Sequence, residues 1–357
     1  MQYMNETLTI WGIDIPIVQT IWMLVKIFAV FGGVMSLAAV LTWAERKGAA
    51  LIQDRIGPNR AKVIGDFRLF GILHLAADGL KLFFKEDLVP TQVSRGLFWI
   101  APLLAFVPAM MGFAIIPFGQ SFSWGGQTFH LSVIDPGNGL GMLYPMAIAA
   151  LAVYGIFSAS WASNNKYSML SGMRGAAHMV SYEIGMSLAV IAIFLQAGAY
   201  DPHEIISAQS GLWNVIRQPL GFLVFFVCAF AETNRLPFDF AEGESEIIAG
   251  FMTEFSGMKL GLLWLSEYIH MVTASALMVT LYFGGWQVPF VSDPGPIISL
   301  IAFAAKLLFF CWVFIWVRWT LPRFRYDQLM FIGWKVMLPI GIANVILCAW
   351  LAQRALA

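Results

Sequence analysis

The chain contains little charge. Only 12% of its 357 residues are Asp, Glu, Lys or Arg, and 59% are hydrophobic. Soluble globular domains carry roughly 25% charged residues, so this composition excludes an ordinary soluble protein. The 21 basic and 21 acidic side chains cancel. A nucleic-acid partner, which an excess of basic residues would favour, is therefore not expected.

Metal ligands and cofactor motifs are also scarce. Cys228, Cys311 and Cys348 each lie alone in an apolar run, and the five histidines have no ligand spacing. This excludes the paired-cysteine pattern of iron–sulfur and zinc sites. The G-x-G-x-G at Gly137–Gly141 follows Asp135-Pro136 and lacks the strand-turn-helix context of a dinucleotide site. We expect no flavin, iron–sulfur cluster or metal on this chain.

Long apolar runs dominate instead. Stretches of about 20 residues are long enough to cross the ~30 Å hydrocarbon layer as helices, which satisfy their own backbone hydrogen bonds in lipid. The sequence predicts an all-α polytopic membrane protein with a single membrane domain over residues 1–357. About eight spans are expected, near 17–43, 97–117, 141–162, 175–197, 213–231, 260–283, 297–317 and 333–352.

The basic residues give an orientation. The connectors after the first, third, fifth and seventh expected spans contain 17 of the 21 Lys and Arg residues. By the positive-inside rule these connectors face the cytoplasm, and both termini lie on the outer, periplasmic side. The N-terminal sequence Met1-Gln2-Tyr3-Met4-Asn5-Glu6 has no basic region or small-residue cleavage site, so no cleaved signal peptide is expected.

The first inner connector differs from a simple loop. Between Asp66 and Lys85, apolar residues alternate with Arg68, His74, Asp78, Lys81 and Lys85. That many charges exclude an ordinary span, while the apolar content is too high for a free loop. The pattern predicts an amphipathic helix over about 66–85, lying at the membrane interface and walling a chamber open to the membrane edge.

A second inner connector, at about 232–257, is strongly acidic. Six of the 21 acids lie within Ala231–Phe255, namely Glu232, Asp239, Glu242, Glu244, Glu246 and Glu254. A helix in this connector would put Glu242 and Glu246 on one face. Clustered carboxyls titrate as a coupled set, which suits proton transfer. A solvated acidic surface, or a docking patch for a basic partner, would also explain the pattern.

Two further acids, Glu183 and Glu267, lie inside expected spans. A charged side chain at the bilayer centre costs about 2.5–3.5 kcal/mol on insertion scales, so an intramembrane acid indicates a functional site by default. A carboxyl that gains and loses a proton there could belong to a proton relay. The structural alternative is an ion pair or hydrogen bond, for instance with Lys26 or Lys306 on other spans.

Several longer motifs resemble one family. They are E-R-K-G from Glu45, Q-D-R-I-G-P-N-R from Gln53, W-A-S-N-N-K-Y-S from Trp161, S-Y-E from Ser181, A-E-T-N-R-L-P-F-D from Ala231 and P-R-F-R-Y-D-Q-L-M from Pro322. The chain resembles the H-type membrane subunit of proton-pumping NADH-quinone oxidoreductase, respiratory complex I, which is similar to mitochondrial NADH dehydrogenase subunit 1. The resemblance runs from about Glu45 to about Lys335.

The resemblance implies roles for particular residues. It implies a quinone chamber, with ubiquinone as the expected substrate, that involves Arg46, Arg55, Arg60, Asp78, Phe251, Phe255 and Arg318. It implies a proton path through Glu183, Glu232, Glu242, Glu244, Glu246 and Glu267. The chain departs from some relatives in its third span, where Ala149 and Ala150 stand in place of a Glu. At that point the path must use water or a neighbouring subunit.

The resemblance also implies the setting. The partners would be the quinone-proximal subunits of the peripheral arm and neighbouring small membrane subunits, in a bacterial inner membrane. Three alternatives stay open. The chain could be a scaffold that only anchors the peripheral arm, or a quinone-independent subunit of a related membrane-bound hydrogenase. A free-standing transporter is disfavoured because the sequence has no visible internal repeat.

Overall fold

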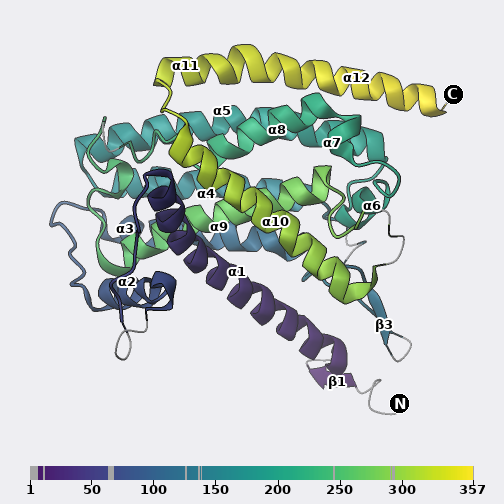
Figure 1. Ribbon diagram of the computed structural model, residues 1–357, viewed down its shortest axis with the longest axis horizontal. Coiled ribbons are helices and arrows are strands. Elements are labelled where there is room, and N and C mark those ends of the chain that lie inside the picture. The colour runs from purple at the N-terminus through teal and green to yellow at the C-terminus, as the bar shows by residue number, and fades with distance from the viewer. Residues whose placement is uncertain are drawn as a thin grey trace.

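The protein is a bundle of long helices (Figure 1). The computed structural model describes residues 7–10, 13–62, 68–124, 127–135, 137, 139–243, 246–289, 291 and 294–356. Within these ranges, seven helical segments are long and apolar enough to cross a membrane. The predicted class, an α-helical polytopic membrane protein, is therefore confirmed.

The seven segments lie close to the predicted spans. They are α1 (Ile17–Ile52), α3 (Arg95–Met111) with the short helix η3 (Gly112–Ile115), α4 (Leu143–Ala162), α5 (Lys166–Ala197), α9 (Gly257–Tyr282), α10 (Gly295–Thr320), and a last helix formed by α11 (Tyr326–Phe331), the π-helical turn η5 (Ile332–Met337) and α12 (Leu338–Leu356).

The predicted span at 213–231 is broken. Its residues form α7 (Asn214–Arg217) and α8 (Pro219–Glu232), separated by Gln218 at φ −133° and ψ 64°. Pro219 explains the break, because a proline lacks the backbone N–H and disfavours helical dihedrals in the residue before it. With 14 residues, α8 is about 21 Å long, shorter than a full crossing of the ~30 Å hydrocarbon layer.

Two helices extend further than the sequence suggested. We expected Glu45, Arg46 and Lys47 in a connector after residue 43, but α1 continues through them to Ile52. No proline lies between Ile17 and Pro58, so no missing backbone N–H ends the helix earlier. Likewise α5 begins at Lys166 rather than near 175, and the side chain of Asn165 caps it by accepting from Tyr167 N at 2.9 Å.

The predicted amphipathic helix is present in a shorter form. The helix α2 spans Leu73–Phe84 and follows the short turn η2 (Leu69–Gly71). Val63–Phe67, which include the first two residues of the predicted element, lie outside the described residues. Gly71 allows the bend before α2, because it has φ +86° and a Cβ there would lie 2.0 Å from the Pro58 carbonyl oxygen. No residue of α2 is buried.

Short elements cap one end of the bundle. The hairpin strands β1 (Thr7–Ile10) and β2 (Ile13–Pro16) precede α1, while β3 (Phe122–Trp124) pairs antiparallel with β4 (Gln127–Phe129) after η3. In Figure 1, β1, β3, α6 (Pro202–Ser207), α7 and the end of α12 lie at one end, and α2 and α11 lie at the other. The start of α1 and the end of α12 therefore share one end of the bundle.

The packing centre is α9. Every residue from Met271 to Tyr282 is buried. Small residues bring other helices close: a Cβ on Gly155 of α4 would lie 2.6 Å from the backbone nitrogen of Ala105 in α3. Such backbone approach is the usual way in which helices associate in lipid, where no hydrophobic force drives them together. The polar residues that remain inside this bundle mark the candidate site.

Candidate functional site

The most deeply buried charge belongs to Arg235, whose side chain is 1% exposed. Its Nη1 donates to Glu45 Oε2 at 2.8 Å, and its guanidinium lies 4.4 Å from the centroid of the Tyr268 ring. The second oxygen of Glu45 accepts from Arg318 Nη1 at 2.7 Å. One carboxylate of α1 thus binds two arginines. One comes from the acidic connector at 232–257, called the acidic segment below, and the other comes from α10.

This arrangement keeps Arg235 charged. Burial by itself lowers the pKa of an arginine, but the Glu45 carboxylate opposes burial, and the pKa of Arg235 lies above its ordinary value. Both oxygens of Glu45 accept from arginine, while Nε and Nη2 of Arg235 are buried with no hydrogen-bond partner among the described residues. The cluster Glu45–Arg235–Arg318 is therefore a fixed charge that holds the start of the acidic segment between α1 and α10.

A second ion pair holds the middle of the acidic segment. Asp239 Oδ2 accepts from Arg323 Nη2 at 3.0 Å, and Asp239 Oδ1 accepts from the backbone nitrogen of Glu242 at 3.2 Å. Burial raises the pKa of Asp239, and the charges of Arg323 and Arg318 oppose that rise without cancelling it. This carboxyl thus holds a proton more readily than an exposed aspartate does.

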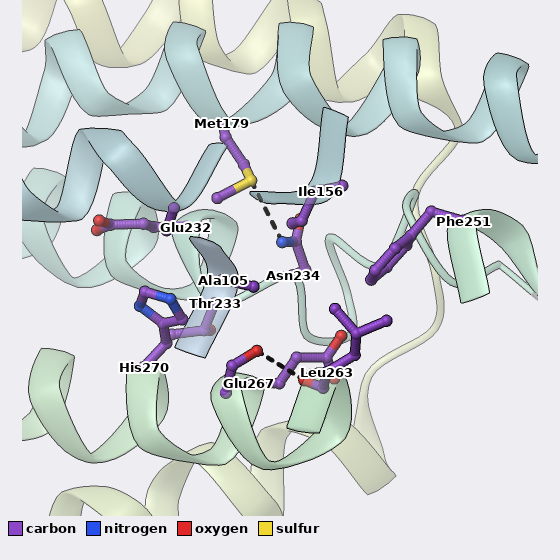
Figure 2. A pocket seen from close by; sticks show the side chains of 12 residues that line it. Ala105, Ile156, Met179, Glu232, Thr233, Asn234, Phe251, Leu263, Glu267 and His270 are labelled. Atoms are coloured by element: carbon purple, nitrogen blue, oxygen red, sulfur yellow. Dashed lines mark hydrogen bonds between the residues drawn. The ribbon is translucent and has the colours of Figure 1, made fainter. Parts of the chain in front are cut away.

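Between the helices lies a small cavity that mixes acids with apolar side chains. Its water-accessible volume is about 20 Å³, which is enough to hold a water molecule. Figure 2 shows Glu232 and His270 on one side, Phe251 on the opposite side and Glu267 projecting from α9 between them. The complete lining is Ala105, Ala152, Ile156, Met179, Glu232, Thr233, Asn234, Phe251, Leu263, Ser266, Glu267 and His270.

Four predicted acids interact in this region, and two of them line the cavity. Glu183 of α5 is close enough to Glu232 for their charges to interact. Glu232 and Glu267 line the same cavity. Glu267 in turn interacts with Glu242 and Asp239 of the acidic segment, and with Arg235 and Arg318. We call Glu183, Glu232, Glu267 and Glu242 the acid line; at Glu267 it interacts with Arg235 and Arg318 of the Glu45–Arg235–Arg318 cluster.

The structural alternative for the two intramembrane acids is wrong in its specific form. Lys26 pairs with Asp135 at 2.9 Å. Lys306 donates to the carbonyl oxygens of Phe283, Gly285 and Gln287 at 2.8, 3.0 and 2.6 Å. Both lysines thus have other partners than Glu183 and Glu267. Moreover, Glu267 Oε1 is buried and has no hydrogen-bond partner among the described residues.

The other predicted acids lie elsewhere. Glu246 is exposed and pairs with Arg174 at 2.5 Å, and Glu244 lies outside the described residues. The expected helix joining Glu242 to Glu246 is not formed, since residues 241–243 and 246–249 are turns and irregular backbone. Gly243 between the two acids, and Ile248 at φ +48°, disfavour a helix at this point.

The predicted chamber residues fall into two groups. Arg46 lies next to Glu45 on α1 and pairs with Asp78 of α2, so adjacent residues of one helix connect α2 with the arginine cluster. The connector after α1 is exposed at Arg55, whose Nε donates to Gln53 Oε1 at 2.8 Å, and at Arg60. The exposed side of α2 carries Leu80, Phe83 and Phe84.

In the second group, Phe251 and Phe255 are buried and Arg318 is half-buried. Phe251 lines the acid cavity, as described above. Phe255 stacks on Phe98 with ring centroids 4.2 Å apart and an interplanar angle of 6°. Arg318 binds Glu45. Phe251, Phe255 and Arg318 are thus more buried than Arg55 and Arg60, which are exposed.

Sequence reasoning missed several polar residues of the site. Glu45 and Arg235 stand inside the quoted motifs but were not singled out, and Asp239 was counted only as one of six clustered acids. One signal could have found Arg235: it is the only basic residue within Ala231–Phe255. No local pattern pointed to His270 or Tyr268, because their roles depend on which helices meet.

The buried arginine cluster generates a stability prediction. Arg235→Met should lower the free energy of unfolding by about 3–5 kcal/mol, because it leaves a buried carboxylate with one partner fewer. Glu45→Met/Arg235→Met should lose less than the sum of the two single changes. The matched control is Arg325→Met, which breaks an exposed pair with Asp327 and should cost at most about 1 kcal/mol. Thermal unfolding in detergent measures all four, and strictly additive losses at Glu45 and Arg235 would contradict the buried pairing.

Comparison with known proteins identifies the family of the chain. Residues 25–349 match the family model described as NADH dehydrogenase. The chain is 43% identical over 341 residues to an H-type NADH-quinone oxidoreductase subunit of Cytophaga hutchinsonii, covering 94% of this chain and 97% of that protein. It is 46% identical over 333 residues to the H-type subunit of Leptospira biflexa, covering 89% and 91%. It is 43% identical over 342 residues to an H-type subunit of Geobacter sulfurreducens, covering 93% and 95%. The chain therefore belongs to the NADH dehydrogenase family, as a relative of the H-type membrane subunits of NADH-quinone oxidoreductase.

Proposed function

We propose that this chain forms much of a quinone-binding chamber and couples quinone reduction to proton translocation. The observation that carries the proposal is the acid line, which ends beside the Glu45–Arg235–Arg318 cluster and one residue from the Arg46–Asp78 pair. The proposed proton route and the proposed contact site for the polar headgroup of the quinone thus meet on α1. This deepens what the family membership gives, a membrane subunit of an oxidoreductase complex.

The proposed topology follows the bundle. The chain crosses the inner membrane of a bacterium about eight times, with α7 and α8 together making the broken crossing. The end with α2, α11 and the acidic segment faces the cytoplasm, and both termini face the periplasm. Basic residues concentrated in the connectors at the α2 end support this orientation. The cytoplasmic end docks on the quinone-proximal subunits of the peripheral arm, and the flanks contact small membrane subunits.

The coupling step is electrostatic. Reduction of a quinone to quinol takes two electrons, supplied by partner subunits, and two protons. A unit charge that appears or disappears 10 Å from a carboxyl changes its energy by about 1.7 kcal/mol at an effective dielectric constant of about 20. That is more than a tenfold change in proton affinity. The fixed charges of Arg235 and Arg318 set the resting proton affinity of Glu267. A change in the charge of the quinone shifts that affinity, and Glu267 gains or loses a proton.

The acid line can relay the change. Glu267 and Glu232 share a cavity with room for water, so a proton can pass between them through a hydrogen-bonded molecule. Glu183 continues the line into α5. In the third span, where Ala149 and Ala150 offer no carboxyl, water or a neighbouring subunit carries the path onward.

Two other functions predict different outcomes. A scaffold subunit, or a quinone-independent subunit of a membrane-bound hydrogenase, would use the same charges only to fasten protein to protein. The buried position of Glu267, with one oxygen unpaired among the described residues, favours proton transfer over fastening, because a purely structural carboxyl is expected to have its hydrogen bonds completed.

The acid line gives the first functional prediction. Glu267→Gln or Glu183→Gln should lower quinone reductase activity and proton pumping about tenfold or more, the scale of losing a proton-transfer group, while the complex still assembles. Glu204→Gln, on the exposed face of α6, is the matched control and should leave both unchanged. Activity with a quinone analogue and pumping in proteoliposomes provide the measurement. Full pumping with either variant would remove that residue from the relay.

The chamber gives the second. Arg46→Ala should raise the KM for quinone about tenfold, the cost of roughly one charge-assisted hydrogen bond, with an intact complex. Arg354→Ala, an exposed arginine near the end of α12, serves as control. A tail-labelled photoreactive quinone should attach within residues 68–85 or 233–256. Failed assembly of Arg46→Ala, together with labelling only near β3 and α6, would favour the scaffold function instead.

A further inference from the structure

Three buried polar atoms from three helices face one point beside Gly221. They are Gln218 Oε1 at the start of α8, the Tyr282 hydroxyl at the end of α9 and Asn344 Nδ2 in α12. None of the three has a hydrogen-bond partner within the described part of the chain, and their residues are at most 3% exposed. A Cβ on Gly221 would lie 2.9 Å from Asn344 Nδ2, 3.2 Å from Gln218 Oε1 and 3.4 Å from the Tyr282 oxygen.

Neighbouring contacts fix which atoms face that point. The amide nitrogen of Gln218 donates to the Ala192 carbonyl at 3.1 Å and to Gln196 Oε1, which leaves its oxygen turned toward Gly221. The carbonyl oxygen of Asn344 faces Cys348 Sγ at 4.0 Å, which leaves its amide nitrogen turned inward. The point is therefore surrounded by one acceptor, one donor and a hydroxyl that can act as either.

We propose that this point binds a structural water molecule that joins α8, α9 and α12. Such a water accepts from Asn344, donates to Gln218 and exchanges a hydrogen bond with Tyr282. Buried waters typically make about three hydrogen bonds to groups that otherwise lack partners. A small cation fits poorly, because the inward N–H of Asn344 repels positive charge.

Gly221 makes the site possible. A glycine inside a helix is destabilising relative to alanine, and here a Cβ would crowd all three polar groups, each within 3.4 Å of it. Gln196, the second partner of Gln218, is exposed at the end of α5, so the water can exchange with the surface. Glu232 lies 11 positions after Gly221 in α8, about 16 Å along a helix. The site is thus independent of the acid cavity.

The location gives the water a structural task. The backbone breaks between α7 and α8 at Gln218, directly before Pro219. At this break the side chain of Gln218 spans from α5 to the point beside Gly221. A water bound there links the broken segment α7–α8 to α9 and α12. A continuous helix would not need such a link.

Paired substitutions in the assembled, detergent-purified complex test the site. Gly221→Ala places a methyl group where the polar atoms converge and should lower the melting temperature. Gly221→Ser projects a hydroxyl beyond the Cβ toward the same atoms and should recover most of the loss. The control pair is Gly33→Ala and Gly33→Ser in α1, where a Cβ meets nothing within 4 Å; alanine should be the better residue there, because it is the stronger helix former.

A higher melting temperature for Gly221→Ser than for Gly221→Ala supports the bound water. Equal stability of Gly221→Ala, Gly221→Ser and the unaltered protein overturns it. A map of the unaltered complex that resolves ordered waters provides the second readout. A density peak within hydrogen-bond distance of Gln218 Oε1, Asn344 Nδ2 and the Tyr282 oxygen supports the proposal. A direct Gln218–Asn344 hydrogen bond, or the absence of such a peak, overturns it even if the variants fail to assemble.

Discussion

The carboxylate of Glu45, held between Arg235 and Arg318, joins three segments of the chain near the α2 end of the bundle. Three parts of the chain that are distant in sequence meet at this one group: α1, the acidic segment and α10. Two positive charges are retained in a largely desolvated site because both carboxylate oxygens accept from them. Since Arg46 follows Glu45 directly and binds Asp78, the same turn of α1 also connects to α2. The contact with α2 is therefore adjacent in sequence to Glu45, whose arginine partners interact electrostatically with Glu267.

Desolvation is the second constraint, and it acts on the acids. Glu232 and Glu267 line a cavity of mostly apolar side chains, while Lys26 and Lys306 are occupied by Asp135 and by backbone carbonyls. A carboxyl in such surroundings responds to modest changes of local charge. At Asp239 the charge of Arg323 favours the ionised form, but burial outweighs it and the pKa of this carboxyl lies above its ordinary value. A carboxyl bound to arginine and one with an oxygen unpaired among the described residues, Glu267, thus lie in the same region.

The sequence predicted the parts of this molecule that depend on local chemistry. The apolar runs located the long helices, and the isolated acids of α5 and α9 indicated a polar interior. Helix ends were harder to predict. The helix α1 passes through Glu45-Arg46-Lys47 because charged residues do not break a helix, and Pro219 explains why the apolar segment at 214–232 is divided. The cluster around Arg235 could not be foreseen, since Glu45 lies 190 positions away in the chain and Arg318 belongs to a third segment, α10. The proposed water site beside Gly221 could not be predicted either, because it depends on Tyr282 and Asn344 from other helices.

The central claim is that carboxyls of the acid line change protonation when quinone is reduced. Redox-induced infrared difference spectroscopy of the purified complex tests it most directly, because protonated carboxyls absorb apart from the amide backbone. We expect a carboxyl band that changes between the oxidised and reduced quinone states, and that is altered or lost in Glu267→Gln. Identical difference spectra for the unaltered protein and for both Glu267→Gln and Glu183→Gln would contradict the claim.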